Sequence, residues 1–155
     1  MKTLIIYYSR KGRTAKIARK WAHKTGASRL AISPMAYRGT MREYLQYLIC
    51  TLTRRDMELD LHNVDFSKYD RIVLMVPVIC GMMSAPVRTF VRQEAGRLQN
   101  VEYVIVHKGF RARQPKMVRW LDKTLGVKHL ACSSIHQSFN KSFKARCIDG
   151  QSILK

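Results

Sequence analysis

The sequence is short of acidic residues. Its 155 residues include 10 Asp and Glu against 29 Lys and Arg, which gives a formal net charge of +19. The deficit is uneven: residues 1–42 carry eleven basic residues and no acidic one, residues 43–102 carry seven against eight, and residues 103–155 carry eleven against two. A charge of this size bears on partners and solubility rather than on fold, so we expect anionic partners.

The patterns of secreted, zinc-binding and membrane-spanning chains are also missing. The four cysteines and five histidines show no zinc or other ligand spacing, and no arrangement for a catalytic nucleophile is present. We find no signal peptide at the start and no apolar run of membrane-spanning length. We therefore expect one domain over residues 1–155, cytoplasmic, with reduced thiols, and with Cys50 and Cys132 as small buried residues.

The most informative stretch runs from Leu4 to Thr14. Its first five residues are apolar, β-branched or aromatic, which predicts a strand buried on both faces. Hydroxyls, cations and Gly12 follow, and from Thr14 onward a helical period takes over. A strand, a short polar turn and a helix present backbone N–H groups and the positive end of a helix dipole to a phosphate. The turn therefore predicts an anion site, with an ordinary turn that binds nothing as the alternative.

The rest of the chain repeats this alternation of strands and helices. Further strands are expected at residues 29–33, 71–78, 101–107 and 129–138, and further helices at residues 41–52, 86–95 and 115–125. The alternation predicts an α/β fold with a doubly wound parallel sheet and helices on both faces. Ligands of such sheets lie at the carboxyl ends of the strands, where the loops 9–14, 79–85 and 108–114 would meet.

The second predicted helix has a strong apolar stripe. Thr40 is its expected N-cap. The stripe repeats at the i, i+3, i+4, i+7, i+8 and i+11 positions, and we expect it to be core that packs against the sheet; it comprises Met41, Tyr44, Leu45, Leu48, Ile49 and Leu52.

Two motifs resemble those of the flavodoxin family. The pattern Tyr7-x-Ser9-x-x-Gly12-x-Thr14-x-x-x-Ala18 is similar to its FMN-phosphate signature, and residues 65–90 resemble its flavin-flanking segment. The resemblance runs from residue 2 to about residue 110. It implies a flavodoxin-like, doubly wound, five-stranded parallel sheet of order 2-1-3-4-5 with FMN as cofactor. It also implies these cofactor-binding residues: Ser9, Arg10, Lys11, Gly12, Arg13, Thr14, Pro77, Val78, Ile79, Cys80, Gly81, Lys108, Gly109 and Phe110.

The chain departs from the family pattern at three places. Ile79 stands where the family often has a Trp, so a bound flavin would lose a stacking partner worth roughly 0.5–1.5 kcal/mol. The loop that starts at Lys108 is basic rather than small, and its Phe110 is either a replacement stacking face or an ordinary Phe. Residues 143–155 have too few apolar residues at helical spacing for the usual last helix, so that helix is expected to be shortened or absent. A sheet face could then be covered by a second copy in a homodimer.

Six cations are expected around the flavin end of the sheet. They come from two loops and are Arg10, Lys11, Arg13, Lys108, Arg111 and Arg113. A cation near a reduced, anionic flavin stabilises that state, so the sign of the effect is a raised reduction potential. Individually, such residues are often solvated loop cations, which is the alternative interpretation.

Three functions follow from these observations. The first is an FMN-dependent redox protein that transfers electrons to an acidic partner protein, or an oxidoreductase that reduces a small anionic or quinone-like substrate. The second is a cofactor-free domain of the same fold that binds nucleic acid or an anionic membrane through its basic faces. The third is an enzyme similar to the FMN-type protoporphyrinogen oxidases, which the opening residues and the basic charge resemble. The sequence leaves open whether the protein is an enzyme.

Overall fold

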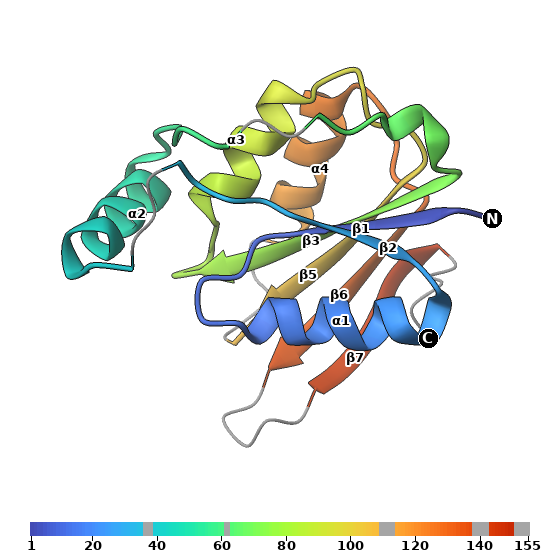
Figure 1. The fold of residues 1–155 in the computed structure, drawn as a ribbon, viewed down its shortest axis with the longest axis horizontal. Helices are drawn as coiled ribbons and strands as arrows, with labels where there is room; N and C mark the ends of the chain where they lie inside the picture. Colours follow the sequence, from blue (N-terminus) through green and yellow to red (C-terminus); the bar gives the residue numbers. More distant parts are fainter. Residues whose placement is uncertain (36–38, 61–62, 109–113, 138–142, 151–155) are drawn as a thin grey trace.

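The computed structural model describes residues 1–35, 39–60, 63–108, 114–137 and 143–150. Strands and helices alternate along most of the chain, as the hydrophobic periods predicted (Figure 1). The elements are β1 (Thr3–Tyr7), α1 (Arg13–Thr25), β2 (Ser28–Ala31), α2 (Met41–Thr53), the short 3₁₀ helix η1 (Phe66–Lys68), β3 (Arg71–Ile79), β4 (Met82–Met83), α3 (Ala85–Gln93), β5 (Val101–His107), α4 (Gln114–Leu125), β6 (Ala131–Gln137) and β7 (Phe143–Gly150).

The sheet runs in the order β2-β1-β3-β5-β6-β7, and the first five of these strands pair in parallel. The predicted five-stranded order 2-1-3-4-5 therefore needs correction. The two-residue β4, inside the loop predicted at 79–85, pairs back on β3 in the antiparallel direction and takes the fourth place along the chain. The seventh strand, β7, adds an antiparallel edge next to β6.

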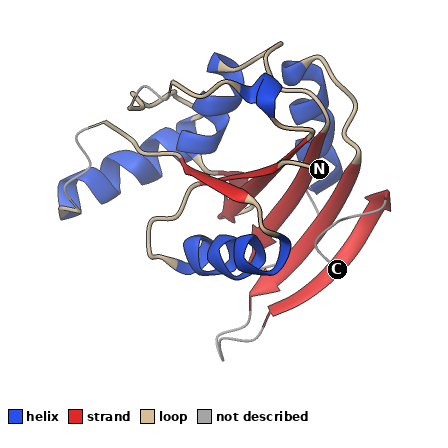
Figure 2. Cartoon of the chain, turned by 45° about the vertical axis from the view of Figure 1, so that its right-hand side comes forward, coloured by secondary structure: helices blue, strands red, loops and turns tan. Residues whose placement is uncertain are grey.

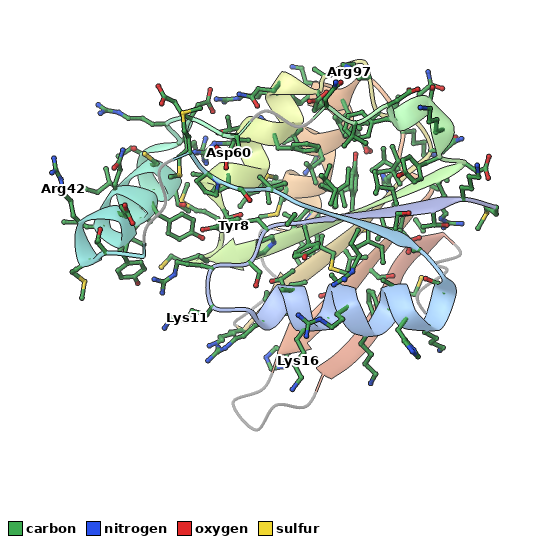
Figure 3. All side chains as sticks on the ribbon, in the orientation of Figure 1. Tyr8, Lys11, Lys16, Arg42, Asp60 and Arg97 are labelled. Atoms are coloured by element: carbon green, nitrogen blue, oxygen red, sulfur yellow. The ribbon has the colours of Figure 1, made fainter. Side chains whose placement is uncertain are left out.

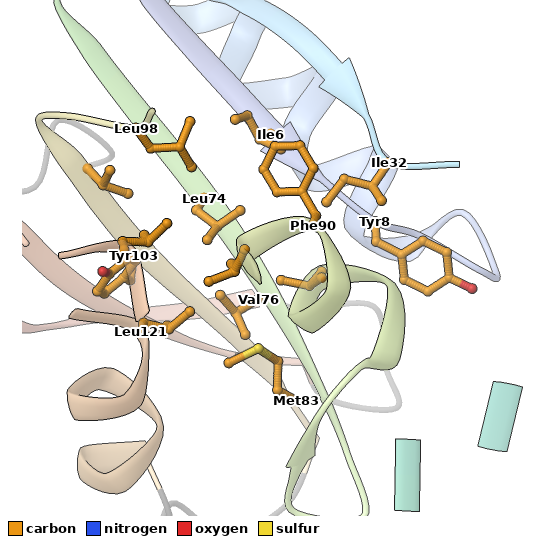
Figure 4. Packing of buried hydrophobic residues seen from close by; sticks show 14 of the residues in the cluster. Ile6, Tyr8, Ile32, Leu74, Val76, Met83, Phe90, Leu98, Tyr103 and Leu121 are labelled. Atoms are coloured by element: carbon orange, nitrogen blue, oxygen red, sulfur yellow. The ribbon is translucent and has the colours of Figure 1, made fainter. Parts of the chain in front are cut away.

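Helices cover both faces of the sheet, as predicted (Figures 1 and 2). On one face α1 packs Ile17, Ala18 and Ala22 against sheet residues such as Val73 and Val104. On the other face α3 and α4 pack against the alternate residues of the same strands, and Figure 4 shows this core from close by. Successive residues of a strand point to opposite faces, so a strand between two helical layers is apolar throughout.

Four of the six stripe residues of α2 are exposed, which contradicts the prediction for these four. Tyr44 and Leu48 are half-buried, and Tyr44 packs against the core as expected. Met41 is 80%, Leu45 55%, Ile49 45% and Leu52 47% exposed. The buried side of the helix carries Tyr47, Cys50 and Thr51 instead. Helical periodicity predicts which residues share a face, but it cannot say which face meets the sheet.

α2 is capped locally at its start and anchored to α3 at its end. At its start, Glu43 N donates to Thr40 Oγ1 and Thr40 N donates to Glu43 Oε2, which together form a capping box. At its end, the buried Arg88 of α3 donates from Nη2 to the carbonyls of Cys50 (2.8 Å) and Arg55 (2.7 Å). These contacts satisfy backbone groups that a helix end leaves without partners.

The C-terminal part of the described chain is a strand. Residues 143–150 form β7 at the sheet edge, where we expected at most a shortened helix. On the α1 side of the sheet, Val104, Val106 and Ile135 are buried within the single chain. These positions offer no bare sheet face, and the homodimer stays a prediction.

The structure bears on thiols, metal sites and membrane-spanning helices only within the residues that it describes. Within them, Cys50 and Cys80 are free thiols, and Cys50 and Cys132 are buried as predicted. The described ranges contain no group of three or more His, Cys, Asp or Glu side chains that could hold a metal ion. None of the helices in these ranges is long and apolar enough to cross a membrane.

Candidate functional site

A cavity of about 500 Å³ lies at the carboxyl ends of β1, β3 and β5. This is the place where doubly wound sheets bind ligands, and the volume is in the range of small-molecule sites. Its lining residues are Tyr8, Ser9, Arg10, Lys11, Arg13, Thr14, Tyr44, Tyr47, Pro77, Val78, Ile79, Cys80, Gly81, Val106, His107 and Lys108.

The first wall is the turn between β1 and α1. Gly12 is the N-cap of α1 with φ of 74°, a left-handed conformation that glycine adopts without strain. No side chain of the described residues caps this helix, and its first turn has no acidic residue. The N–H groups at the start of α1 are therefore available to an anion, and the helix dipole favours one there.

Ser9 gives this wall a polar group that points to a ligand. Its Oγ is buried, yet it has no hydrogen-bond partner among the described residues. A buried hydroxyl without a partner costs about 1–3 kcal/mol, so native proteins seldom leave one unmatched. Because Ser9 also lines the cavity, a bound acceptor at this point would satisfy it.

The second wall is the hairpin that follows β3. Cys80 and Gly81 both have positive φ, 51° and 74°, between the paired residues Ile79 and Met82. Two consecutive positive φ angles are the mark of a tight two-residue hairpin turn. The turn folds the chain back over the end of β3, so that Pro77, Val78 and the turn itself line the cavity.

The third wall comes from the end of β5. His107 is 5% exposed, and its Nε2 is 2.7 Å from Ser134 Oγ, which also accepts from Gln114 Nε2 at 3.3 Å. The His107 and His136 rings meet edge to face with centroids 5.4 Å apart. Lys108 is exposed at the rim, and His136 Nε2 is 3.0 Å from its carbonyl oxygen. Hydrogen bonds thus hold the imidazole of His107 in place at the cavity.

The fourth wall is aromatic and comes largely from α2. Tyr44 and Tyr47 line the cavity from this helix. The Tyr47 ring packs against Tyr8, with centroids 5.7 Å apart, and the guanidinium of Arg10 lies over Tyr44. In Figure 3, Tyr8 lies between the sheet and α2.

The charge of the cavity is positive. Arg10, Lys11, Arg13 and Lys108 line it, and none of its described lining residues is acidic. Four of the six predicted cations are thus brought together. The other two, Arg111 and Arg113, lie outside the described residues.

The structure brings together most of the residues that the sequence predicted. Gly12 stands between two lining residues and caps α1. Gly109 and Phe110 lie outside the described residues. The predicted residues that line the cavity are Ser9, Arg10, Lys11, Arg13, Thr14, Pro77, Val78, Ile79, Cys80, Gly81 and Lys108.

Five lining residues were missed. Tyr8 and Val106 were predicted only as strand residues, and His107 only as the last residue of a strand. Tyr44 and Tyr47 had a signal, because aromatic residues at i and i+3 of a helix share one face, but the sequence could not place that face at the cavity.

Comparison with known proteins bears on the fold. The sequence matches no protein-family model, and it matches no curated protein either. The structure is similar to that of a flavoprotein from Lactobacillus acidophilus NCFM in complex with FMN, with a TM-score of 0.69 and 21% identity over 86% of this chain and 91% of that one. The apo-form of the flavoprotein from the same organism matches with a TM-score of 0.64 and 23% identity, over 86% and 90%.

A candidate flavoprotein from Bacteroides eggerthii DSM 20697 is also similar, with a TM-score of 0.66 and 16% identity over 86% of this chain and 85% of that one. Both the FMN complex and the apo-form match, so the likeness belongs to the polypeptide fold itself. The chain has a flavodoxin-like fold, shared with these flavoproteins.

Proposed function

We propose that this protein binds FMN in the cavity at the carboxyl ends of β1, β3 and β5 and acts as a redox protein. The observation that carries the proposal is the buried, unmatched Ser9 Oγ beside three cations and a helix start without a side-chain cap. This donor set suits a phosphate monoester, because hydroxyl, backbone N–H and cationic groups all donate. The similar L. acidophilus structure was determined with FMN, which supports the same ligand here.

The other walls of the cavity suit the ring system of FMN. The turn of residues 9–14 would hold the phosphate, and the hairpin at Cys80 and Gly81 together with the tyrosines of α2 would hold the ring system. FMN, when bound, supplies the chemistry, since it exchanges electrons with a donor and an acceptor. The tyrosines offer aromatic area that Ile79 cannot, so the absence of the expected Trp does not leave the cavity without rings.

The chain's own residues would set the energetics of that exchange. Arg10, Lys11, Arg13 and Lys108 favour a bound group that gains negative charge, which would raise its reduction potential. The same positive rim would attract an acidic redox partner, or a small anionic or quinone-like substrate, through long-range steering. His107 presents a buried imidazole, hydrogen-bonded to Ser134, to the same cavity.

A cofactor-free binding domain is the second candidate. The outer face of α1 favours it, because Lys16, Arg19, Lys20, His23 and Lys24 are all exposed there. Such a face can bind the phosphates of a nucleic acid. It does not explain the buried Ser9 Oγ or the cavity, so we rank it below the FMN proposal.

A paired titration tests the proposal. The fluorescence of FMN and of riboflavin, which lacks the phosphate, is followed as each is titrated with the protein. We expect FMN to bind at least about tenfold more tightly, because only FMN reaches the donors of the turn. Equal binding of the two flavins would contradict the phosphate site, and binding of neither would leave the second candidate as the better account.

A further inference from the structure

The exposed apolar stripe of α2 is the largest feature that the proposed function leaves unexplained. Seven large apolar side chains among the described residues are markedly exposed, and four of them, Met41, Leu45, Ile49 and Leu52, lie on this one helix. At i, i+4, i+8 and i+11 they form a single stripe along a helix about 20 Å long. Grouped exposed apolar residues mark interaction sites more often than scattered ones do.

Cations lie at both ends of the stripe. Arg42 is exposed beside Met41, and Arg54 and Arg55 are exposed after the last turn. The sequence from residue 39 to residue 55 contains one acidic residue, Glu43, whose carboxylate serves in the capping box. Figure 3 shows Arg42 at the outer side of α2, which projects away from the sheet in Figure 1. An apolar strip between cations complements the acyl chains and phosphates of an anionic lipid surface.

The helix is preformed rather than folded on contact. The capping box fixes its start, and Arg88 holds its end through the carbonyls of Cys50 and Arg55. Thr51 Oγ1 also accepts from Ala85 N at 3.1 Å, which ties the buried side of α2 to α3. Docking therefore needs little ordering of the chain, which is the main cost for an amphipathic segment that is disordered in solution.

The shape and charge of the surface argue against a second copy as its occupant. Two chains of +19 would meet with cations at the same helix ends, and one stripe of four side chains is small beside the 1,200 Å² or more of a typical stable interface. The stripe residues line neither the cavity at the sheet end nor the smaller one, which is lined by Asp56, Met57, Glu58, Thr89, Arg92 and Gln93. A convex apolar strip that lines neither of these cavities fits a flat surface better than the anchor residues of a protein partner.

We propose that α2 docks this protein on anionic membrane surfaces, with Met41, Leu45, Ile49 and Leu52 inserted at the headgroup boundary and Arg42, Arg54 and Arg55 among the lipid phosphates. Tyr44 and Tyr47 of the same helix line the cavity, so a docked protein holds the wall of its cavity close to the bilayer. The proposal goes beyond FMN binding and does not depend on it.

Co-sedimentation of the full chain with vesicles tests the proposal. Mixed phosphatidylcholine–phosphatidylglycerol vesicles are compared with pure phosphatidylcholine vesicles, without added flavin. We expect binding to the mixed vesicles, and a loss of about tenfold or more in the double variant Leu45→Gln/Ile49→Gln. The matched control is Leu130→Gln, whose leucine is 45% exposed near the start of β6, at the other end of the sheet from the cavity, and which should bind as the original does.

A position-specific probe separates docking from general attraction by the basic surface. The fluorescence that Met41→Trp adds to that of the native Trp21 and Trp120, taken as the difference from the original protein, should shift to the blue with mixed vesicles, whereas that added by Leu130→Trp should not. Equal binding of the double variant and the original, or equal shifts at both positions, would overturn the proposal. So would a dimer in analytical ultracentrifugation that the double variant dissociates, because the stripe would then be a contact between copies. Since no flavin is present, these outcomes leave the FMN proposal untouched.

Discussion

The guanidinium carbon of Arg10 lies 3.9 Å from the centroid of the Tyr44 ring. This contact joins the turn after β1 to α2, two segments more than thirty residues apart, and both residues line the cavity. A cation over an aromatic face is worth about 0.5–1 kcal/mol at an exposed site and more when water is excluded. The contact therefore closes one side of the cavity and makes α2 part of its wall.

Tyr44 should matter for ligand affinity through its ring. We expect Tyr44→Leu to weaken FMN binding several-fold, because both the aromatic area and the contact with Arg10 are lost. Tyr44→Phe keeps the ring and should bind FMN as the original does. Fluorescence titration of both variants checks this, and a loss of affinity in Tyr44→Phe as large as in Tyr44→Leu would show that the ring is not the cause.

Ser9 should contribute to FMN affinity through the phosphate. Ser9→Ala should weaken FMN binding by about 10- to 100-fold, the range for one hydrogen bond to a charged group, and leave riboflavin binding unchanged. Ser84→Ala is the matched control, since Ser84 Oγ is also buried without a partner among the described residues but does not line the cavity. If both variants bind FMN equally, Ser9 does not contact the phosphate.

The cations of the rim should raise the reduction potential of bound FMN. A charge about 10 Å away is worth about 0.4–1.7 kcal/mol between the dielectric limits of water and protein surface, before screening by salt. Lys11→Gln should therefore lower the potential by about 10–40 mV in a reductive titration, and less in high salt. Lys20→Gln, an exposed lysine of α1 that does not line the cavity, should leave it within a few mV. Equal shifts in the two variants would assign the effect to net charge alone.

Arg88 should hold α2 in place. It is 5% exposed, and burial lowers the pKa of its guanidinium, although the group stays charged at neutral pH. Arg88→Met leaves the carbonyls of Cys50 and Arg55 without their donor, and we expect a loss of about 2–4 kcal/mol in the free energy of unfolding in urea. Arg92→Met breaks a half-exposed ion pair with Asp56 and should cost less than about 1 kcal/mol. Comparable losses in both variants would contradict the anchoring role of Arg88.

Tyr103 should make the protein less stable at alkaline pH. Burial, together with the hydrogen bond from its hydroxyl to Asp122 Oδ1 at 2.9 Å, raises the pKa of Tyr103 well above its usual value near 10. Below about pH 9 both states keep the proton and the contribution is complete. Above about pH 10 the unfolded chain loses the proton first, so the free energy of unfolding falls with rising pH. Tyr103→Phe should make that slope shallower by about 1.4 kcal/mol per pH unit. Identical slopes in urea unfolding would refute the assignment.

Local sequence patterns were sufficient to predict the strand ends and turns around the cavity. The turn from Ser9 to Thr14 and the end of β3 are each set by a strand signal followed by a break in period, and parallel strands bring their carboxyl ends to one edge. The cavity could therefore be placed from these patterns, and the resemblance to the flavodoxin family implied most of its lining residues.

The predictions that were wrong concern features that depend on tertiary contacts. The period of α2 grouped Tyr44 with Met41, Leu45 and Ile49, yet the helix turns its tyrosines to the cavity and the other three outward. The strand β7 had a signal that helical spacing did not capture, because residues 143–147 alternate apolar and basic types with a period of two. The pairing of β4 with β3 rests on the two positive φ angles at Cys80 and Gly81, and a cysteine in that conformation is not predicted by propensity.

The visible absorption spectrum of the purified protein, recorded after mixing with excess FMN and exhaustive dialysis, tests the central claim most directly. The account predicts that flavin absorption bands stay with the protein, and that they are lost when Ser9→Ala is treated in the same way. A protein that returns colourless from dialysis, with no fluorescence change on titration with FMN, would contradict the claim that this cavity holds FMN.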